Sequence, residues 1–194
     1  MKWSDIKLYQ FNKIQEAVKI DNDEERIVQI AQIIFGDDVV DLPLSEFAQK
    51  VKELSFLNEP LPTNVPPKKI TVNGRKYFLD CLLGNITTAQ YVDFTNHSKT
   101  NDICKMLSVF LIPENRKYND GYDMLQVIND INDLPVTVVN DAAFFFVRHL
   151  ELFTETFQSY SIKRLKKMKM PKQLKESLIK VMEDSVHSAL SHLY

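Results

Sequence analysis

Apolar side chains recur at spacings of three and four between residues 130 and 160. The members of this stripe are Val136, Val139, Ala143, Phe146, Val147, Leu150, Phe153 and Phe157. That period is typical of a helix with a buried face. Phe144 and Phe145 add apolar surface outside the stripe, so we expect a core helix that is covered on more than one side. Asp133 is the expected N-cap, and Pro135 suits the first turn.

Amphipathic patterns before residue 59 predict three further helices. We expect the first to start at a cap on Ser4 and to run to Val18. The second should begin in the acidic segment 21–25, because carboxylates favour a first turn, and should end at Gly36. The third is expected over residues 45–54.

Three more helices are expected between the hairpin and the core helix. Thr87 or Thr88 should cap the first of them. Asn101 or Asp102 should begin the second, which we expect to run through Leu111 and to end at Pro113. Asp123 should cap the third, a short helix over residues 124–131.

Four of the eight prolines lie in residues 59–67. Proline cannot continue a helix and favours extended chain, so we interpret this segment as a linker or a subdomain boundary. Asn73-Gly74 follows between two β-prone runs, and this dipeptide is a strong signal for a β-hairpin. A hairpin this small has to pack on helices to be stable.

After Tyr160 the chain becomes basic and then apolar again. The basic residues are Lys163, Arg164, Lys166, Lys167, Lys169, Lys172 and Lys175. Pro171 suits the start of a last helix. Its apolar stripe includes Leu174, Leu178, Val181, Met182, Val186, Ala189, Leu190 and Leu193. Two arrangements remain open for this stripe: it folds back on the body of the protein, or it docks in a partner's groove.

These patterns predict a mainly α fold: a multi-helix bundle with one small β-hairpin and a separate C-terminal helical arm. We divide the chain into an N-terminal helical segment (1–58), the proline-rich linker (59–67), and the hairpin with the helical core (68–160). A basic linker and C-terminal amphipathic helix (161–194) complete it. The 194 residues suit about one domain.

Net charge is −2, which gives no global signal for binding polyanions. Residues 1–60 hold 7 basic and 12 acidic groups, a balance of −5, whereas residues 161–194 hold 8 basic and 3 acidic groups, a balance of +5. This asymmetry predicts an acidic body and a basic arm. The basic run offers a phosphate or acidic-partner contact, and Lys163, Arg164, Lys166, Lys167 and Lys169 are the candidate residues. No aromatic residue is interleaved among these lysines, so a solvated surface is the favoured interpretation and nucleic-acid binding is disfavoured.

Motifs for catalysis or metal binding are missing from the sequence. The two cysteines, Cys81 and Cys104, make neither a disulfide framework nor a zinc site, and we expect both to be reduced and buried. A histidine within an apolar helix is more often a hydrogen-bonded core residue than a catalytic one, and we expect the same of His149. We therefore expect no enzyme, no catalytic residue, no metal and no cofactor. We also expect no membrane segment and no signal peptide, which fits a cytoplasmic product.

Short motifs spread over about residues 1–160 resemble a known group of proteins. They include Trp3-Ser4-Asp5-Ile6, Leu42-Pro43-Leu44, Ile70-Thr71-Val72-Asn73-Gly74-Arg75, Ile86-Thr87-Thr88-Ala89-Gln90-Tyr91-Val92-Asp93, Val109-Phe110-Leu111-Ile112-Pro113, Tyr118-Asn119-Asp120-Gly121-Tyr122-Asp123 and Leu134-Pro135. Together they resemble small proteins encoded in the structural-gene region of tailed bacteriophages of gut bacteria. Such proteins are often described as tail assembly chaperone-like.

The resemblance implies a non-enzymatic role in virion morphogenesis, in the host cytoplasm during assembly, with presence in the virion as an option. Phage tail or other virion proteins are then the expected partners, with self-association as an option. The residues expected to bind a partner are Leu174, Leu178, Val181, Met182, Val186 and Leu190. Alternatives are a packaged protein ejected with the genome and a nucleic-acid-binding regulator that uses residues 163–175.

Overall fold

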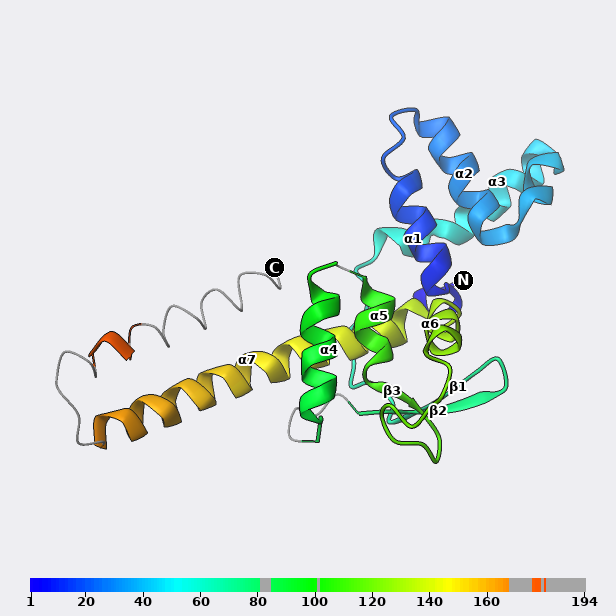
Figure 1. The fold of residues 1–194 in the computed structure, drawn as a ribbon. Helices are drawn as coiled ribbons and strands as arrows, with labels where there is room; N and C mark the ends of the chain where they lie inside the picture. The colour runs from blue at the N-terminus through cyan, green and yellow to red at the C-terminus, as the bar shows by residue number, and fades with distance from the viewer. Residues whose placement is uncertain (81–84, 101, 168–175, 179, 181–194) are drawn as a thin grey trace. The chain divides into compact units, whose positions relative to one another are not determined.

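The computed structural model describes residues 1–80, 85–100, 102–167, 176–178 and 180. Of residues 149–161 and 164–166 it describes the backbone only. The chain forms two compact units: residues 1–80 with 86–143, and residues 81–85 with 144–194. The described residues are mainly helical, as the sequence predicts, and a small sheet accompanies them (Figure 1). The division between the units falls within the longest helix and not at the proline-rich segment.

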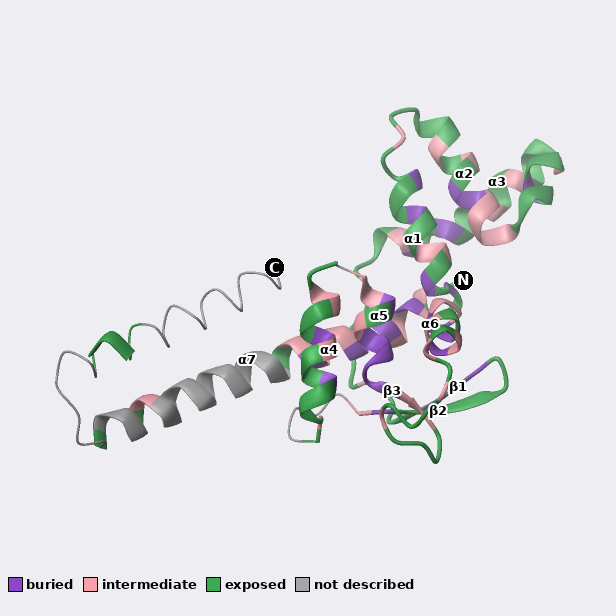
Figure 2. Cartoon of the chain, in the orientation of Figure 1, coloured by how far each residue is buried: buried purple, intermediate pink, exposed green. Residues whose placement is uncertain are grey.

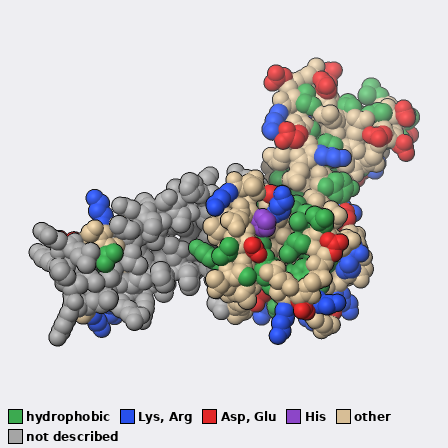
Figure 3. Space-filling model, in the orientation of Figure 1, with side chains coloured by type: hydrophobic (Ala, Val, Ile, Leu, Met, Phe, Trp, Pro, Cys, Tyr) green, Lys and Arg blue, Asp and Glu red, His purple; other side chains and the backbone are tan. Residues whose placement is uncertain are grey.

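The first unit begins with three helices, α1 (Leu8–Ala17), α2 (Asp23–Phe35) and α3 (Leu44–Glu53). The Asn22 side chain caps α2 by accepting the N–H groups of Glu24 and Glu25. Gly36, with φ +97°, ends α2 as predicted, because few other residues adopt that conformation. Figure 3 shows acidic side chains gathered over α1, α2 and α3.

The predicted cap at Ser4 is wrong. Ser4 lies in a short 3₁₀ helix (Trp3–Asp5), and α1 begins only at Leu8. Between them the chain is extended because it pairs with distant backbone: Leu8 N–H donates to the Leu134 carbonyl at 2.9 Å, and Val136 N–H donates to the Ile6 carbonyl at 2.8 Å. The residues around Ser4 could not predict this extended segment, because the backbone groups that pair with it lie more than 120 residues away in the sequence.

The proline-rich segment 59–67 has no helix or strand, as its composition predicts. It is nevertheless held in place within the first unit. The backbone N–H of Asn64 donates to Asp141 at 2.7 Å, and the Asn140 side chain donates to the Pro62 carbonyl at 3.2 Å. Trp3 donates its indole N–H to the Glu59 carbonyl at 3.0 Å. The segment therefore packs along the body of its own unit.

The predicted hairpin is confirmed as β1 (Lys69–Val72) and β2 (Arg75–Leu79). Both turn residues have positive φ, 50° at Asn73 and 74° at Gly74, which matches the right-handed twist of the strands. A third strand, β3 (Leu111–Pro113), pairs antiparallel with β2 and gives the order β1-β2-β3.

Helices α4 (Thr88–Ser98), α5 (Ile103–Ser108) and α6 (Met124–Asn132) follow the predicted order. Thr87, Asp102 and Asp123 cap them through their side chains, as predicted. The expectation of a helix through Leu111 is wrong, because α5 ends at Ser108 and Leu111 belongs to β3. Val109, Phe110 and Leu111 are all nearly fully buried, and a buried strand and a buried helix segment share this apolar signature.

The long helix α7 (Val136–Lys167) contains the stripe that the sequence singled out. Asp133 is the C-terminal cap of α6 and not the N-cap of α7, so that prediction is wrong. The basic linker predicted to begin at residue 161 is wrong for residues 161–167, which are helical and continue α7. Many of the buried residues of the first unit lie on α5, α6, the sheet and the start of α7, and others lie on α1 and α2 (Figure 2). The largest of them include Phe110, Ile6, Leu111, Ile131 and Leu134.

Candidate functional site

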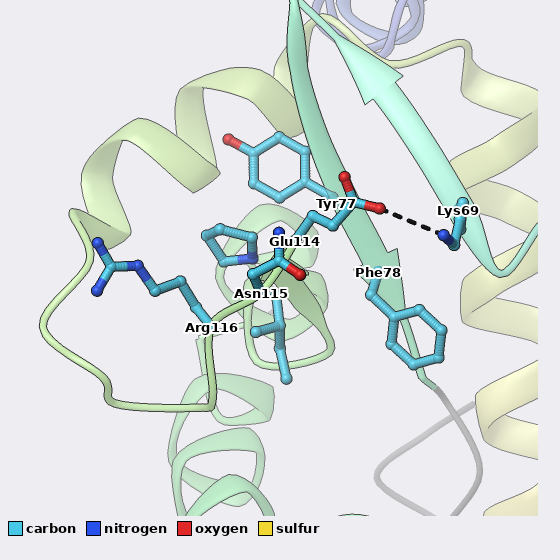
Figure 4. A pocket seen from close by; sticks show the side chains of 8 residues that line it. Lys69, Tyr77, Phe78, Glu114, Asn115 and Arg116 are labelled. Atoms are coloured by element: carbon cyan, nitrogen blue, oxygen red, sulfur yellow. Dashed lines mark hydrogen bonds and ion pairs between the residues drawn. The ribbon is translucent and has the colours of Figure 1, made fainter.

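A pocket of about 260 Å³ lies beside the sheet of the first unit (Figure 4). Its lining residues come from all three strands and the loop after β3: Lys69, Tyr77, Phe78, Ile112, Pro113, Glu114, Asn115 and Arg116. Lys69 Nζ and Glu114 Oε1 form an ion pair at 3.2 Å, and the Arg116 side chain extends away from this pair. Phe78 is 40% exposed. The pocket therefore offers an apolar floor with charged groups around it.

None of these eight residues supplies a nucleophile with an adjacent base. The lining group nearest to reactive chemistry is the Tyr77 hydroxyl, and it donates a hydrogen bond to Asp130. Burial, and then the neighbouring Asp130 carboxylate, raises the pKa of Tyr77 to about 12.

A cluster of polar side chains surrounds Asp130, which is fully buried in α6. Arg75 on β2 donates to both carboxylate oxygens at 2.6 Å, in a bidentate pair. Tyr77, on the same face of β2, donates at 2.5 Å. Asn73, in the hairpin turn, donates to Asp130 at 2.9 Å and to Asp133 at 2.8 Å. We call these residues, together with Lys7, the Asp130 cluster.

Lys7 completes the cluster from the N-terminal segment. Its ammonium group forms an ion pair with Asp133 at 3.0 Å. The cluster thus joins three parts of the chain that are far apart in sequence: the segment before α1, the hairpin, and the end of α6. Because a buried carboxylate without partners would be very costly, these hydrogen bonds also fix where the hairpin can lie.

The charges in the cluster stabilise each other's ionised forms. Hydrogen bonds from Arg75 hold the pKa of Asp130 well below its usual range, and Tyr77 and Asn73 add to this effect. The hydrogen bond from Asn73 and the ion pair with Lys7 lower the pKa of Asp133. The hydrogen bond to Asp133 raises the pKa of Lys7. A carboxylate that is ionised and saturated with donors is poorly suited to act as a general base.

The other candidate for chemistry is Cys104, which is buried, as expected. Its sulfur lies 3.3 Å from the Asn132 side-chain oxygen. Burial, followed by the charge of Asp102, raises the pKa of the Cys104 thiol to about 11. Reactive cysteines have lowered pKa values, so this thiol lacks activation. The side chain of His149 and all of Cys81 lie outside the described residues.

Few of the predicted site residues are described in the structure. Leu178 is helical and 37% exposed. Lys163 and Lys167 are exposed and lie one turn apart on α7, which suits the predicted charged face. The backbone of Arg164 and Lys166 is part of the same helix. Leu174, Val181, Met182, Val186, Leu190 and Lys169 lie outside the described residues.

The sequence did not predict the Asp130 cluster. The Asn73-Gly74 dipeptide predicted the turn, and Asp130 and Asp133 could be placed near the end of an apolar helix. Nothing in the local pattern connected them, because the two groups lie more than 50 residues apart.

Within the described part of the chain, we find neither a helix that is long and apolar enough to cross a membrane nor three or more His, Cys, Asp or Glu residues grouped to hold a metal. Comparisons with protein-family models, curated proteins and solved structures found no match to this chain.

Proposed function

We propose that this protein acts through protein–protein contacts in the assembly of a tailed bacteriophage, most directly of its tail, or as a component of the virion. The motifs over residues 1–160 that resemble tail assembly chaperone-like proteins are the reason for the phage setting. In this proposal the protein is not an enzyme, and it works in the host cytoplasm during assembly.

The observation that carries the non-enzymatic part of the proposal is the use of the reactive groups. Arg75, Tyr77 and Asp130 bond to one another, and the Cys104 thiol is buried with a raised pKa. We interpret these groups as stabilising the first unit and not as taking part in a reaction. A rigid body that presents apolar segments is what an assembly factor needs, because a partner's sticky surface is held by apolar contact.

The C-terminal segment is the proposed main contact with the partner. Removing residues 165–194 should leave the first unit folded and should reduce capture of phage proteins from infected cells. Circular dichroism would check the fold, and mass spectrometry of the captured proteins would measure the loss. Unchanged capture by the shortened chain would contradict this assignment.

Mass spectrometry of purified virions separates the two forms of the proposal. An assembly chaperone should be missing from mature particles, whereas a structural or packaged protein should be present in fixed proportion. Detection of the chain at a constant ratio to other tail proteins would therefore favour the virion component.

Binding to nucleic acid is a second candidate function, favoured only by the exposed Lys163 and Lys167. Such binding should weaken steeply as salt rises, because each neutralised phosphate releases counterions. A chain that fails to shift DNA or RNA at low salt would remove this candidate.

A further inference from the structure

Leu44, the first residue of α3, is 83% exposed, more than any other large apolar side chain that the structure describes. The apolar stripe of α3 continues from Leu44 through Phe47 and Val51, yet no residue of this ten-residue helix is buried. A helix this short is marginal in water unless its apolar face is covered. The start of α3 therefore presents an apolar surface that the rest of the first unit leaves open.

Acidic residues accompany Leu44 in the sequence, and no basic residue does. Residues 27–49 contain four acidic side chains and no basic one. All four are exposed, and none of them forms an ion pair with another described residue. Val40, in the same segment, is 47% exposed. We call the whole set the acidic knob: Leu44, Val40, Asp37, Asp38, Asp41 and Glu46.

The pocket beside the sheet has the opposite charge. The segments that line it, residues 68–79 and 111–118, hold six basic side chains and one acidic side chain, a balance of +5. The single acid, Glu114, is already paired with Lys69. Lys76 and Lys117 are exposed, and no described residue forms an ion pair with either of them. The surroundings of the pocket therefore carry an excess of positive charge.

The acidic knob and the pocket are complementary in size, polarity and charge. A pocket of about 260 Å³ is smaller than the roughly 300 Å³ at which small-molecule sites begin, so it suits a single apolar side chain. Phe78 and Ile112, which face each other on β2 and β3, offer that side chain an apolar floor. Leu44 of the same copy does not fill the pocket, because Leu44 is exposed and α3 lies apart from the sheet within the first unit (Figure 1).

We propose that the acidic knob of one copy docks into the pocket of a second copy, with Leu44 against Phe78 and the carboxylates facing Lys76, Arg116 and Lys117. Opposite charges on the two surfaces favour this second copy as the occupant. The two surfaces differ, so each copy keeps one of them free, and the contact repeats from copy to copy until a ring closes. The contact is small and electrostatic, and it is therefore weak and sensitive to salt.

This self-association does not depend on the proposed function. It uses only the first unit, whereas the proposed contact with phage proteins uses the C-terminal segment. Removal of residues 165–194 tests that function and leaves both the acidic knob and the pocket in place. Either idea can therefore fail while the other holds.

Analytical ultracentrifugation of the full chain tests the contact. The average mass of the wild type should rise with protein concentration at low salt and should fall as salt is added. Leu44→Lys and Phe78→Lys should each weaken association at least about tenfold, because each removes one apolar half of the contact. Leu125→Lys is the matched control: Leu125 lies on α6, is 71% exposed, and its substitution should leave association unchanged.

Two further measurements guard against loss of fold. Circular dichroism and the fluorescence of Trp3 should be the same in every variant as in the wild type. Lys76→Glu, which leaves Phe78 in place and reverses one charge beside it, should also weaken association, whereas Lys99→Glu, at the end of α4, should not.

A mixture of two variants tests the pairing itself. Leu44→Lys keeps an intact pocket and Phe78→Lys keeps an intact acidic knob, so the two should bind each other in a one-to-one complex although neither associates alone. Three outcomes would overturn the proposal: a wild type that stays monomeric at low salt, equal association of Leu44→Lys and Leu125→Lys, or a mixture whose components do not bind each other. Association that all of these substitutions leave unchanged would assign self-association to another surface and would contradict the proposal as well.

Discussion

Asp130 shows how one side chain can determine where an element lies. It is fully buried, and its carboxylate receives hydrogen bonds from Arg75, Tyr77 and Asn73. Three donors on or beside one hairpin converge on one helix, so the hairpin has one favoured position. The residue is acidic in sequence, yet structurally it belongs to the core.

Replacing Asp130 by Asn should lower the free energy of unfolding of the first unit by about 2 kcal/mol, since it weakens the hydrogen bonds around a fully buried side chain, although its partner Arg75 is half exposed and can be solvated. Glu114→Gln removes the exposed ion pair with Lys69, and it should cost less than about 1 kcal/mol. Urea titrations of both variants would measure the difference. Equal costs would mean that the Asp130 cluster contributes no more than a surface pair.

Acid should destabilise the first unit through the same carboxylates. The pKa values of Asp130 and Asp133 are lower in the folded chain than their usual value near 4, so the unfolded chain binds protons first as pH falls. Their contribution is therefore complete above about pH 5 and is lost progressively below it. Urea midpoints at pH 7, 5 and 3 would show this decline, and in Asp130→Asn the decline should be shallower.

Tyr77 should produce the opposite dependence in base. Its pKa is raised to about 12 in the folded chain, so the unfolded chain loses this proton first as pH rises above about 10. The contribution of Tyr77 is present below that pH and declines above it. Tyr77→Phe should make the decline shallower, measured as the urea midpoint between pH 9 and 11. It should not abolish the decline, because the pKa values of Tyr118, Tyr122 and Cys104 are also raised in the folded chain. An unchanged profile in this variant would contradict the assignment.

At the scale of elements, the hairpin turn combines a local conformation with a long-range contact. Asn73 has a positive φ, which glycine adopts more readily, and its side chain also donates to Asp130 and Asp133. The backbone conformation at position 73 therefore favours glycine, whereas the hydrogen bonds to Asp130 and Asp133 favour asparagine.

Asn73→Gly should destabilise the first unit by about 1 kcal/mol, because the two lost hydrogen bonds outweigh the relief of backbone strain. Asn119→Gly is the matched control: Asn119 also has positive φ, and its substitution should be neutral or slightly stabilising. In the Asp130→Asn background the cost of Asn73→Gly should shrink, which a double-mutant cycle by urea titration would reveal. Additive costs would show that the two side chains do not cooperate.

The whole molecule consists of two compact units, and only the first contains a tryptophan. Trp3 packs edge-on against Phe56, with ring centroids 5.4 Å apart. Its fluorescence therefore reports on the unfolding of the first unit alone, whereas far-ultraviolet circular dichroism reports on the helices of both units.

Asp130→Asn should lower the urea midpoint of Trp3 fluorescence more than it lowers the midpoint of the circular dichroism signal. The reason is that the substitution lies in the first unit, and units with separate cores can unfold separately. Coincident shifts of both midpoints would show that the two units unfold as one.

The sequence by itself determined the mainly helical class, the Asn-Gly hairpin, the helix caps at Thr87, Asp102 and Asp123, and the end of α2 at Gly36. These features depend on a few neighbouring residues, whose backbone preferences act before any tertiary contact exists. The long apolar stripe of α7 was visible for the same reason, because a helix repeats its own pattern.

Only the tertiary structure decided the late start of α1, the third strand and the Asp130 cluster. In each case the residue that decides the structure lies far away in the sequence. Hydrogen bonds with Leu134 and Val136 keep the chain around Ile6 extended. Leu111–Pro113 forms a strand because it pairs with β2, and Arg75 forms its ion pair with Asp130. Hydrogen bonds and burial between such segments depend on which surfaces meet, and a local pattern of residues carries no record of that.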